Sequence, residues 1–279
     1  MRNISLDFST KTDLRWLSDL MAVFHEAAGD TPLLLVGATV RDLLLEQAHA
    51  IRLLRATDDV DIACIAETWD AFLALRGRLL TSGRFTEVPG ILHRVLYRDG
   101  RRLDLVPFGG VENPDRLIAW PPDGATVVDV FGFQEVLAAA IEFVLPGGVS
   151  VRAPSLAGLA LTKLVAWEDR RNRVPGKDAY DLAVILQHYL PAGNEERLFT
   201  EAAHLLDERD FDYELAGAWL LGHDMAALLP TDHRPRIAQL LAKEADPDGP
   251  LRLVGDMMPT KPDLGLTFLQ AVTRGFREG

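Results

Sequence analysis

The first part of the chain carries a hydrophobic pattern that alternates between helical and strand spacing. A helical pattern runs over residues 12–28 and stops at Gly29-Asp30, with apolar positions at Leu14, Leu17, Leu20, Met21 and Phe24. The continuous apolar run 33–36 then predicts a strand buried on both faces. Gly37 breaks this run and residues 40–45 begin a second helical pattern, so we predict a strand, a tight turn and a helix in succession.

Strand patterns continue beyond this turn. Residues 60–65 predict a strand, and residues 68–80 predict a helix. A hairpin follows, with arms at 94–97 and 103–106, because Asp99-Gly100 is a dipeptide that favours a type I′ turn. Four further elements complete this region: short strands at 126–131 and 149–152, a helix at 136–143 between them, and a turn at Pro146-Gly147-Gly148.

From Ser155 onward the pattern is helical only, and the composition shifts as well. Between Glu195 and Asp246 there are 12 acidic and 5 basic residues. We therefore predict an α+β protein with two domains. Residues 1–153 are expected to form a mixed sheet with flanking helices, and residues 154–279 a helical domain that completes the active-site cleft.

Composition restricts the class of protein. The 279 residues are 48% hydrophobic and 25% charged, enough for one large core or two modest ones. The single cysteine, Cys64, rules out a disulfide framework, and we expect it to be a core residue. No apolar run approaches the roughly 18 to 20 residues that span a bilayer, and the N-terminus lacks a signal-peptide core. We expect a cytoplasmic protein without a membrane partner.

The net charge of -12 opposes a broad, non-specific grip on nucleic acid, although a local basic patch stays open. Against this acidic background, three carboxylates interrupt apolar strands. Side chains alternate between the two faces of a strand, so Asp59 and Asp61 point to one face while Val60 points to the other. Asp104, in the second hairpin arm, completes a triad if its strand lies beside the first. Such a set suits two-metal nucleotidyl transfer with Mg²⁺ or Mn²⁺.

The turn Gly37-Ala38-Thr39 precedes the acidic strand. Its backbone amides, the Thr39 hydroxyl and the helix N-terminus are placed to face an anion, which predicts a phosphate cradle. Arg41 has two interpretations of equal weight. It reaches a phosphate, or it pairs with Asp42 or Glu46.

Two motifs resemble a known family. Residues 37–45 followed by Arg55-Ala56-Thr57-Asp58-Asp59-Val60-Asp61 look like the DNA polymerase β nucleotidyltransferase superfamily. Residues 162–170 and then Lys177-Asp178-Ala179-Tyr180-Asp181-Leu182 look like the abortive-infection nucleotidyltransferase toxins of the AbiEii type. The resemblance covers roughly residues 30 to 190, and its specific parts are the Asp-x-Asp strand and the Lys-Asp-x-x-Asp-Leu helix.

The resemblance implies an enzyme that uses a nucleoside triphosphate (NTP). Metal binding is implied at Asp59 and Asp61, with Asp104 as a third acidic position, and an active-site basic residue at Lys163. The nucleotide-binding set is Gly37, Ala38, Thr39, Arg41, Arg55, Thr57, Lys163, Arg170 and Asp178. The chain departs from the family at Ala38, where a Gly or Ser is usual, and in residues 46–54, which form an extra stretch.

Helical spacing supports part of the second motif. Lys163 shares a face with Leu156, Leu159, Ala160, Trp167 and Arg170, so it interrupts an otherwise apolar stripe and needs a partner. That partner is either a nucleotide phosphate, the interpretation we favour, or Asp178 or Asp181 in a structural ion pair. Asp178 and Asp181 are expected to orient Lys163 and Arg170.

Four functions fit these residues. The leading hypothesis is transfer of a nucleoside monophosphate from an NTP to a hydroxyl acceptor such as an RNA 3′ end, by a toxin that has an antitoxin partner. A rival is an adenylyltransferase acting on a cationic small molecule such as an aminoglycoside, which an acidic surface suits. A tRNA end-adding enzyme is suggested by residues 40–45, but no extended basic tract supports it. The last is a catalytically idle fold that binds a partner.

Overall fold

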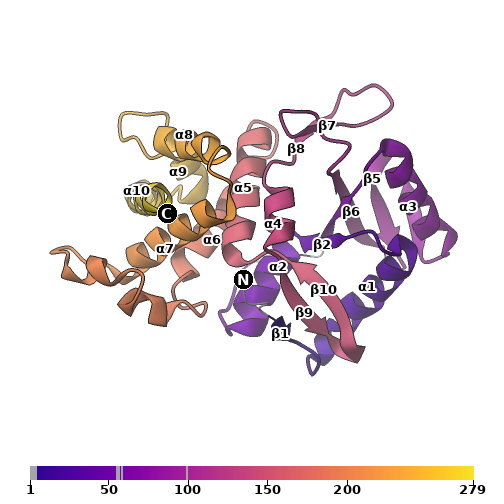
Figure 1. Cartoon of the computed structure of the whole chain (residues 1–279), viewed down its shortest axis with the longest axis horizontal. Coiled ribbons are helices and arrows are strands. Elements are labelled where there is room, and N and C mark those ends of the chain that lie inside the picture. Colours follow the sequence, from indigo (N-terminus) through magenta and orange to yellow (C-terminus); the bar gives the residue numbers. More distant parts are fainter. Residues whose placement is uncertain (1–4, 55–56, 58, 99) are drawn as a thin grey trace. The chain divides into compact units, whose positions relative to one another are not determined.

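The computed structural model describes residues 5–54, 57, 59–98 and 100–279 (Figure 1). The chain divides into two compact units. The first takes in the chain up to Leu43 together with Leu53–Ser155, and the second takes in Leu44–Arg52 and Leu156–Gly279. Part of the extra stretch before the acidic strand therefore belongs with the helical residues of the second unit rather than with the sheet that it interrupts.

The first unit is built on a five-stranded mixed sheet. Its strand order is β2-β3-β6-β5-β4, with bounds Leu33–Val36, Val60–Ile65, Arg101–Phe108, Ile91–Tyr97 and Phe85–Val88. β3 and β6 run parallel, and the other neighbours are antiparallel. The predicted strands at 33–36 and 60–65 and both hairpin arms are confirmed. Asp99 in the hairpin turn lies outside the described residues.

Three helices accompany this sheet. The 3₁₀ turn η1 (Thr12–Leu14) leads into α1 (Arg15–Ala28), as predicted, and α1 buries Leu17, Leu20, Met21 and Phe24. α2 (Ala38–Asp42) continues into a π-helical turn, η2 (Leu43–Ala48). α3 (Trp69–Thr81) follows β3, and its N-cap Thr68 accepts a hydrogen bond from the Ala71 amide at 3.2 Å.

A smaller sheet corrects one sequence prediction. The helix expected over 136–143 ends early: α4 spans Phe133–Ala138, and β9 (Ile141–Leu145) follows. In β9, Ile141, Phe143 and Leu145 are buried while Glu142 is exposed, which is the two-residue period of a strand. β9 pairs with β1 (Ser5–Asp7) and β10 (Val149–Ala153), so tertiary pairing overrides the helical reading of a short apolar run.

The remaining strands form a ribbon. β7 (Leu117–Ala119) pairs antiparallel with β8 (Val127–Asp129), which lies within the predicted strand 126–131. The 3₁₀ turn η3 (Pro146–Gly148) joins β9 to β10 at the predicted Pro-Gly-Gly turn.

The second unit contains only helices, as predicted. Its elements are α5 (Leu156–Arg170), α6 (Lys177–His188), η4 (Glu195–Phe199), η5 (Ala203–Asp207), α7 (Tyr213–Leu228), α8 (Arg234–Glu244), α9 (Arg252–Met257) and α10 (Pro262–Glu278). Glycines let α7 and α10 pack backbone to backbone. A Cβ on Gly222 would lie 2.1 Å from the Val272 carbonyl oxygen, and one on Gly275 would lie 1.9 Å from that of Trp219. Among the described helices, none is both long and apolar enough to cross a bilayer.

Candidate functional site

The acidic residues of the first unit meet on neighbouring strands. β3 and β6 pair in parallel with Asp61 directly opposite Asp104. Val60 and Ile62 are fully buried and Asp61 is partly exposed, as the alternation along a strand predicts. Backbones of paired strands lie about 4.8 Å apart, so these two carboxylates share one patch of the sheet.

Two arginines that the sequence analysis did not single out hold these acids. Arg94 on β5 is the antiparallel register partner of Asp104. Its Nε donates to Asp104 Oδ1 and its Nη2 to Asp104 Oδ2, both at 2.6 Å, which is a bidentate ion pair. Arg102 Nε lies 2.8 Å from Asp59 Oδ1. The signal for Arg94 was the hairpin itself, because a two-stranded register about Asp99-Gly100 places residue 94 near residue 104.

The electrostatics agree with this clustering. The pKa of Arg94 is raised, first by its hydrogen bonds to Asp104, against the opposing effect of partial burial, and further by the negative charges of Asp104, Asp59 and Asp61. All three carboxylates therefore act on one guanidinium. The neighbouring His93 has a lowered pKa because burial disfavours its cation, and the charge of Asp104 opposes that shift.

Gly37 lies against Asp61. It has φ +77°, and a Cβ at this position would lie 2.0 Å from Asp61 Oδ2 and 2.8 Å from Asp61 Cγ. Both the backbone conformation and the lack of space require glycine here. The strand-to-helix turn therefore borders the acidic patch directly.

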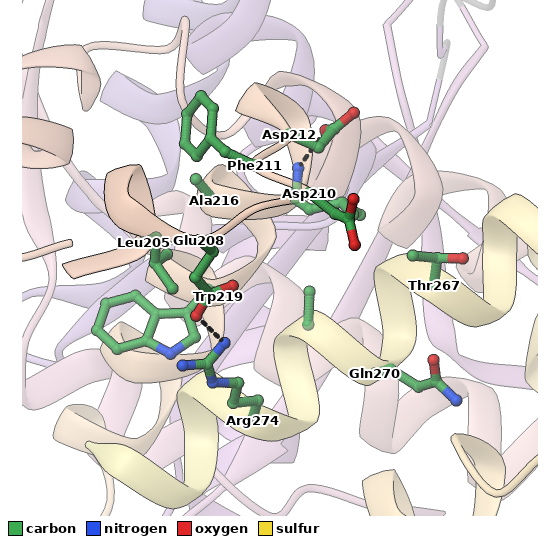
Figure 2. A pocket seen from close by; sticks show the side chains of 12 residues that line it. Leu205, Glu208, Asp210, Phe211, Asp212, Ala216, Trp219, Thr267, Gln270 and Arg274 are labelled. Carbon is green, nitrogen blue, oxygen red and sulfur yellow. Dashed lines mark hydrogen bonds and ion pairs between the residues drawn. The ribbon is translucent and has the colours of Figure 1, made fainter. Parts of the chain in front are cut away.

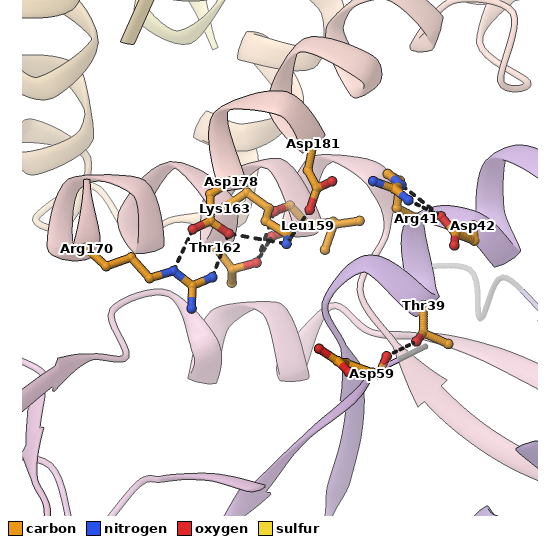
Figure 3. Close-up of polar contacts among 11 residues, drawn as sticks. Thr39, Arg41, Asp42, Asp59, Leu159, Thr162, Lys163, Arg170, Asp178 and Asp181 are labelled. Atoms are coloured by element: carbon orange, nitrogen blue, oxygen red, sulfur yellow. Dashed lines mark hydrogen bonds and ion pairs between the residues drawn. The ribbon is translucent and has the colours of Figure 1, made fainter. Parts of the chain in front are cut away.

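The other residues of the turn are held internally. Ala38 begins α2. The buried Thr39 donates its hydroxyl to the Asp59 carbonyl oxygen at 2.9 Å, which ties the turn to the acidic strand (Figure 3). Arg41 is 1% exposed, and its Nε donates to Asp42 Oδ1 at 2.8 Å. This contact is the ion-pair alternative for Arg41. Of the two motif residues that precede the strand, Thr57 is described, whereas Arg55 lies outside the described residues.

A second polar cluster is built within the second unit. Lys163 Nζ on α5 lies 2.5 Å from Asp181 Oδ2 and 3.3 Å from Asp178 Oδ1, both on α6 (Figure 3). Arg170 donates from Nε and Nη2 to the two oxygens of Asp178 at 2.6 and 2.7 Å. Lys163, Asp178 and Asp181 are all buried. The structure brings together all four charged residues that the second motif singled out.

The charges of this cluster balance one another. Burial by itself raises the pKa of Asp178, but the hydrogen bonds from Arg170 and the charge of Lys163 outweigh it, and the pKa is lowered overall. A lysine on an apolar stripe is stable here because two carboxylates surround it. The structural ion pair left open for Lys163 is thus formed, and contact with a nucleotide stays a prediction.

Comparison with protein families decides what this chain is. The family described as nucleotidyl transferase AbiEii toxin, type IV TA system, matches residues 19–274. The chain belongs to the AbiEii nucleotidyltransferase family. It is an enzyme of the nucleotidyltransferase class, and the resemblance inferred from its two motifs is confirmed. A comparison with curated proteins gives no match.

Two solved structures are similar to this AbiEii-family chain at low level. The antibiotic-resistance factor ANT(2'')-Ia is 18% identical, with 70% of this chain and 99% of that chain covered and a TM-score of 0.37. A protein from H. pylori described as a nucleotidyltransferase is 14% identical, with 96% and 97% covered and a TM-score of 0.36. The family assignment rests on the sequence match alone.

One further group of metal-ligand types occurs in this AbiEii-family chain. Among the described residues, Glu201, His223 and Asp224 bring one ligand atom each within 4.8 Å of one another, a spacing that Asp59, Asp61 and Asp104 do not reach. Arg197 already pairs with both carboxylates of the group formed with His223, because its Nη2 lies 2.6 Å from Glu201 Oε2 and from Asp224 Oδ1. We therefore assign that group to an ion-pair network.

A hollow of about 240 Å³ lies in the second unit, and its lining includes none of the predicted site residues (Figure 2). Its apolar lining includes Leu205 and Trp219, and Arg274 Nη1 bonds Glu208 Oε1 across it at 2.7 Å. Trp219 Nε1 donates to Glu278 Oε2 at 2.7 Å. These four polar groups are paired with one another, and we assign no ligand to the hollow.

The acidic patch of this AbiEii-family chain has the ligand type of a hard divalent cation, while its three carboxylates do not all lie within 4.8 Å of one another. Carboxylate oxygens are the ligands that Mg²⁺ and Mn²⁺ prefer. Asp61 and Asp104 lie opposite one another on β3 and β6, and Asp59 directly precedes β3. Asp59, Asp61 and Asp104 would hold the metal. The glycine turn at Gly37 leaves room beside Asp61 that any other residue would fill.

Proposed function

We propose that this nucleotidyltransferase uses a divalent metal held by Asp59, Asp61 and Asp104 to transfer a nucleoside monophosphate from an NTP to a hydroxyl acceptor. The observation that carries the proposal is the register of β3 and β6, which sets Asp61 opposite Asp104. Residues 1–153 would form the catalytic domain. Gly37, Ala38 and Thr39 lie in the turn that borders the patch and would approach the triphosphate through the backbone.

The bonds change in a single displacement. The acceptor hydroxyl oxygen bonds to the α-phosphorus, the bond from that phosphorus to the β-phosphate bridging oxygen breaks, and pyrophosphate leaves. The hydroxyl proton passes to a carboxylate of the patch. Mg²⁺ or Mn²⁺, when bound, supplies positive charge that stabilises the triphosphate and the leaving pyrophosphate. Because Gly37 has no Cβ, the Asp61 carboxylate can occupy its position beside the turn.

We propose an RNA 3′ end as the acceptor, a toxic effect in the host cell, and an antitoxin as the partner that counters it. The family described by the matching model consists of toxins of toxin–antitoxin systems, and this supports the proposal. The net charge of -12 favours a second candidate acceptor, a cationic small molecule such as an aminoglycoside, because a cation is attracted to an acidic surface.

The test is a transfer assay with each α-labelled NTP, Mg²⁺ or Mn²⁺, and either total RNA or an aminoglycoside panel. Wild type is compared with Asp59→Asn/Asp61→Asn and with a charge-matched control, Asp30→Asn/Asp115→Asn, whose carboxylates lie at exposed positions. We expect transfer to RNA by wild type and the control, and none by the first variant. Transfer to the aminoglycosides alone would select the second candidate.

No transfer to either acceptor class, together with no metal-dependent NTP binding, would overturn the enzymatic proposal. It would leave a fold that acts by binding a partner.

A further inference from the structure

The ion pair between Arg94 and Asp104 occupies the carboxylate that the proposed metal needs. Both oxygens of Asp104 accept from the Arg94 guanidinium at 2.6 Å, so the guanidinium lies across the face that a cation would approach. The two side chains come from paired positions on adjacent antiparallel strands. β5 and β6 each have a neighbouring strand on both sides, so the backbone positions of Arg94 and Asp104 are fixed by the sheet.

The charges of the patch support competition for this carboxylate. The three acids carry three negative charges, and Arg94 and Arg102 return two positive charges through their contacts with Asp104 and Asp59. A divalent cation added to the patch with both arginines in place would lie close to guanidinium charge. Like charges at short distance repel, so metal binding is favoured when a guanidinium moves away.

Arg102 is the more exposed of the two arginines at 54%, but Arg94 is the one that occupies Asp104, and its side chain is also free enough to move. The Arg94 side chain is 25% exposed and that of Asp104 is 19% exposed, so the guanidinium can leave the pair without crossing a packed core. A displaced guanidinium beside a carboxylate–metal centre has a natural second ligand, because planar guanidinium binds phosphate oxygens bidentately. The metal brings a triphosphate to the same place under the proposed function.

We propose that Arg94 and a divalent cation compete for Asp104, and that metal loading releases Arg94 to bind a phosphate of the NTP. The inference rests on the proposed function and deepens it by naming a triphosphate-binding residue. Arg94 then offsets the negative charge of Asp104 before metal arrives and contacts the nucleotide afterwards. Arg94 would therefore bind Asp104 when the metal is absent and a phosphate of the NTP when the metal is bound.

The test measures the affinity for Mn²⁺ and the affinity for an NTP analogue, which removal of the Arg94 charge should change in opposite directions. Mn²⁺ alone is titrated into the full chain, and free ion is followed by electron paramagnetic resonance. A non-cleavable α,β-methylene NTP is then titrated at saturating Mn²⁺ by calorimetry. The variant is Arg94→Met, which keeps the length of the side chain and removes its charge. The control is Arg84→Met, because Arg84 is exposed and lies opposite Arg98, toward the far end of β5.

We expect Arg94→Met to bind Mn²⁺ at least 10-fold more tightly than wild type and the NTP analogue at least 10-fold more weakly, with the control unchanged in both. A residue that only supports the fold would weaken both affinities, and that result overturns the inference. Unchanged Mn²⁺ affinity overturns it as well, while the proposed metal centre survives. Wild type that binds no Mn²⁺ overturns the metal-dependent function and the competition together.

A measurement on wild type covers the case in which Arg94→Met does not fold. The Nε–H signal of Arg94 is assigned in ¹⁵N spectra with the conservative variant Arg94→Lys and followed during titration with Mg²⁺. We expect the signal to move with metal occupancy, since the donor loses its carboxylate acceptor. A signal that stays fixed while metal binds overturns the inference.

Discussion

Asp61 and Asp104 lie directly opposite one another on the parallel strands β3 and β6, although α3, β4 and β5 separate them along the chain. A parallel pair requires a crossover connection, and here α3 and two antiparallel strands provide it. The pairing turns two isolated acidic positions into one patch. Arg94, from the strand on the other side of β6, pairs with the Asp104 carboxylate of this patch.

The register predicts that neutralising Asp61 or Asp104 impairs the patch, and that neutralising Asp104 also breaks its pair with Arg94. We expect Asp61→Asn to lower kcat/KM by at least about 100-fold, because a proposed metal ligand is lost from a centre that depends on charge. Asp104→Asn should also lower the free energy of unfolding, because it leaves Arg94 without its bidentate partner. Steady-state kinetics and urea unfolding separate the effects. Equal stability of Asp104→Asn and wild type would contradict the role of the Arg94–Asp104 pair.

Gly37 predicts a substitution that damages the patch through space alone. Gly37→Ala should destabilise the fold by about 2 kcal/mol or more and lower metal affinity, because its Cβ would lie 2.0 Å from Asp61 Oδ2 at a positive φ. Gly29→Ala is the matched control, with φ +59° and nothing within 4 Å of its Cβ. The control should show the conformational cost without the loss of Mn²⁺ binding. Similar metal binding by the two variants would argue against the contact with Asp61.

The buried cluster of α5 and α6 predicts how stability depends on pH. The folded pKa of Asp178 lies below its ordinary value of 3.8, so ionised Asp178 contributes stability that is present above about pH 4 and lost as the pH falls through the folded pKa. Asp178→Asn should cost about 3 kcal/mol at neutral pH, because it leaves buried positive charge without a partner. Urea unfolding at several pH values measures the difference from wild type. A difference that stays constant below pH 4 would contradict the prediction.

The buried Cys64 lies on β3, so the reactivity of its thiol should report when this strand opens. Burial raises the pKa of its thiol to about 12, so the thiolate is scarce at neutral pH and the folded chain should resist thiol reagents. Labelling by a disulfide reagent should occur only when β3 opens, at a rate that rises with urea. Gly37→Ala should speed labelling, whereas Gly29→Ala should do so only as far as its own stability loss requires. Rapid labelling of native wild type would show that β3 is not buried as described.

Sequence alone determined most of the local structure and the class of enzyme. The apolar run before Gly37, the alternation around Asp61 and the helical stripe that Lys163 interrupts each depend on neighbours only a few residues away. Such short-range patterns can be read from the sequence without knowledge of the tertiary structure. The two motifs were specific enough to indicate the nucleotidyltransferase class, which the family match confirms.

Tertiary structure decided the partners. Long-range strand pairing places β6 beside β3 and lets Arg94 form its ion pair with Asp104. Tertiary structure also places the Asp61 carboxylate against Gly37. No local sequence pattern encodes these contacts. The same cause explains the misread segment at Ile141–Phe143, a short apolar run that becomes a strand because β1 and β10 pair with it. A short apolar run fits either element, and its free energy is set by neighbours brought from far along the chain.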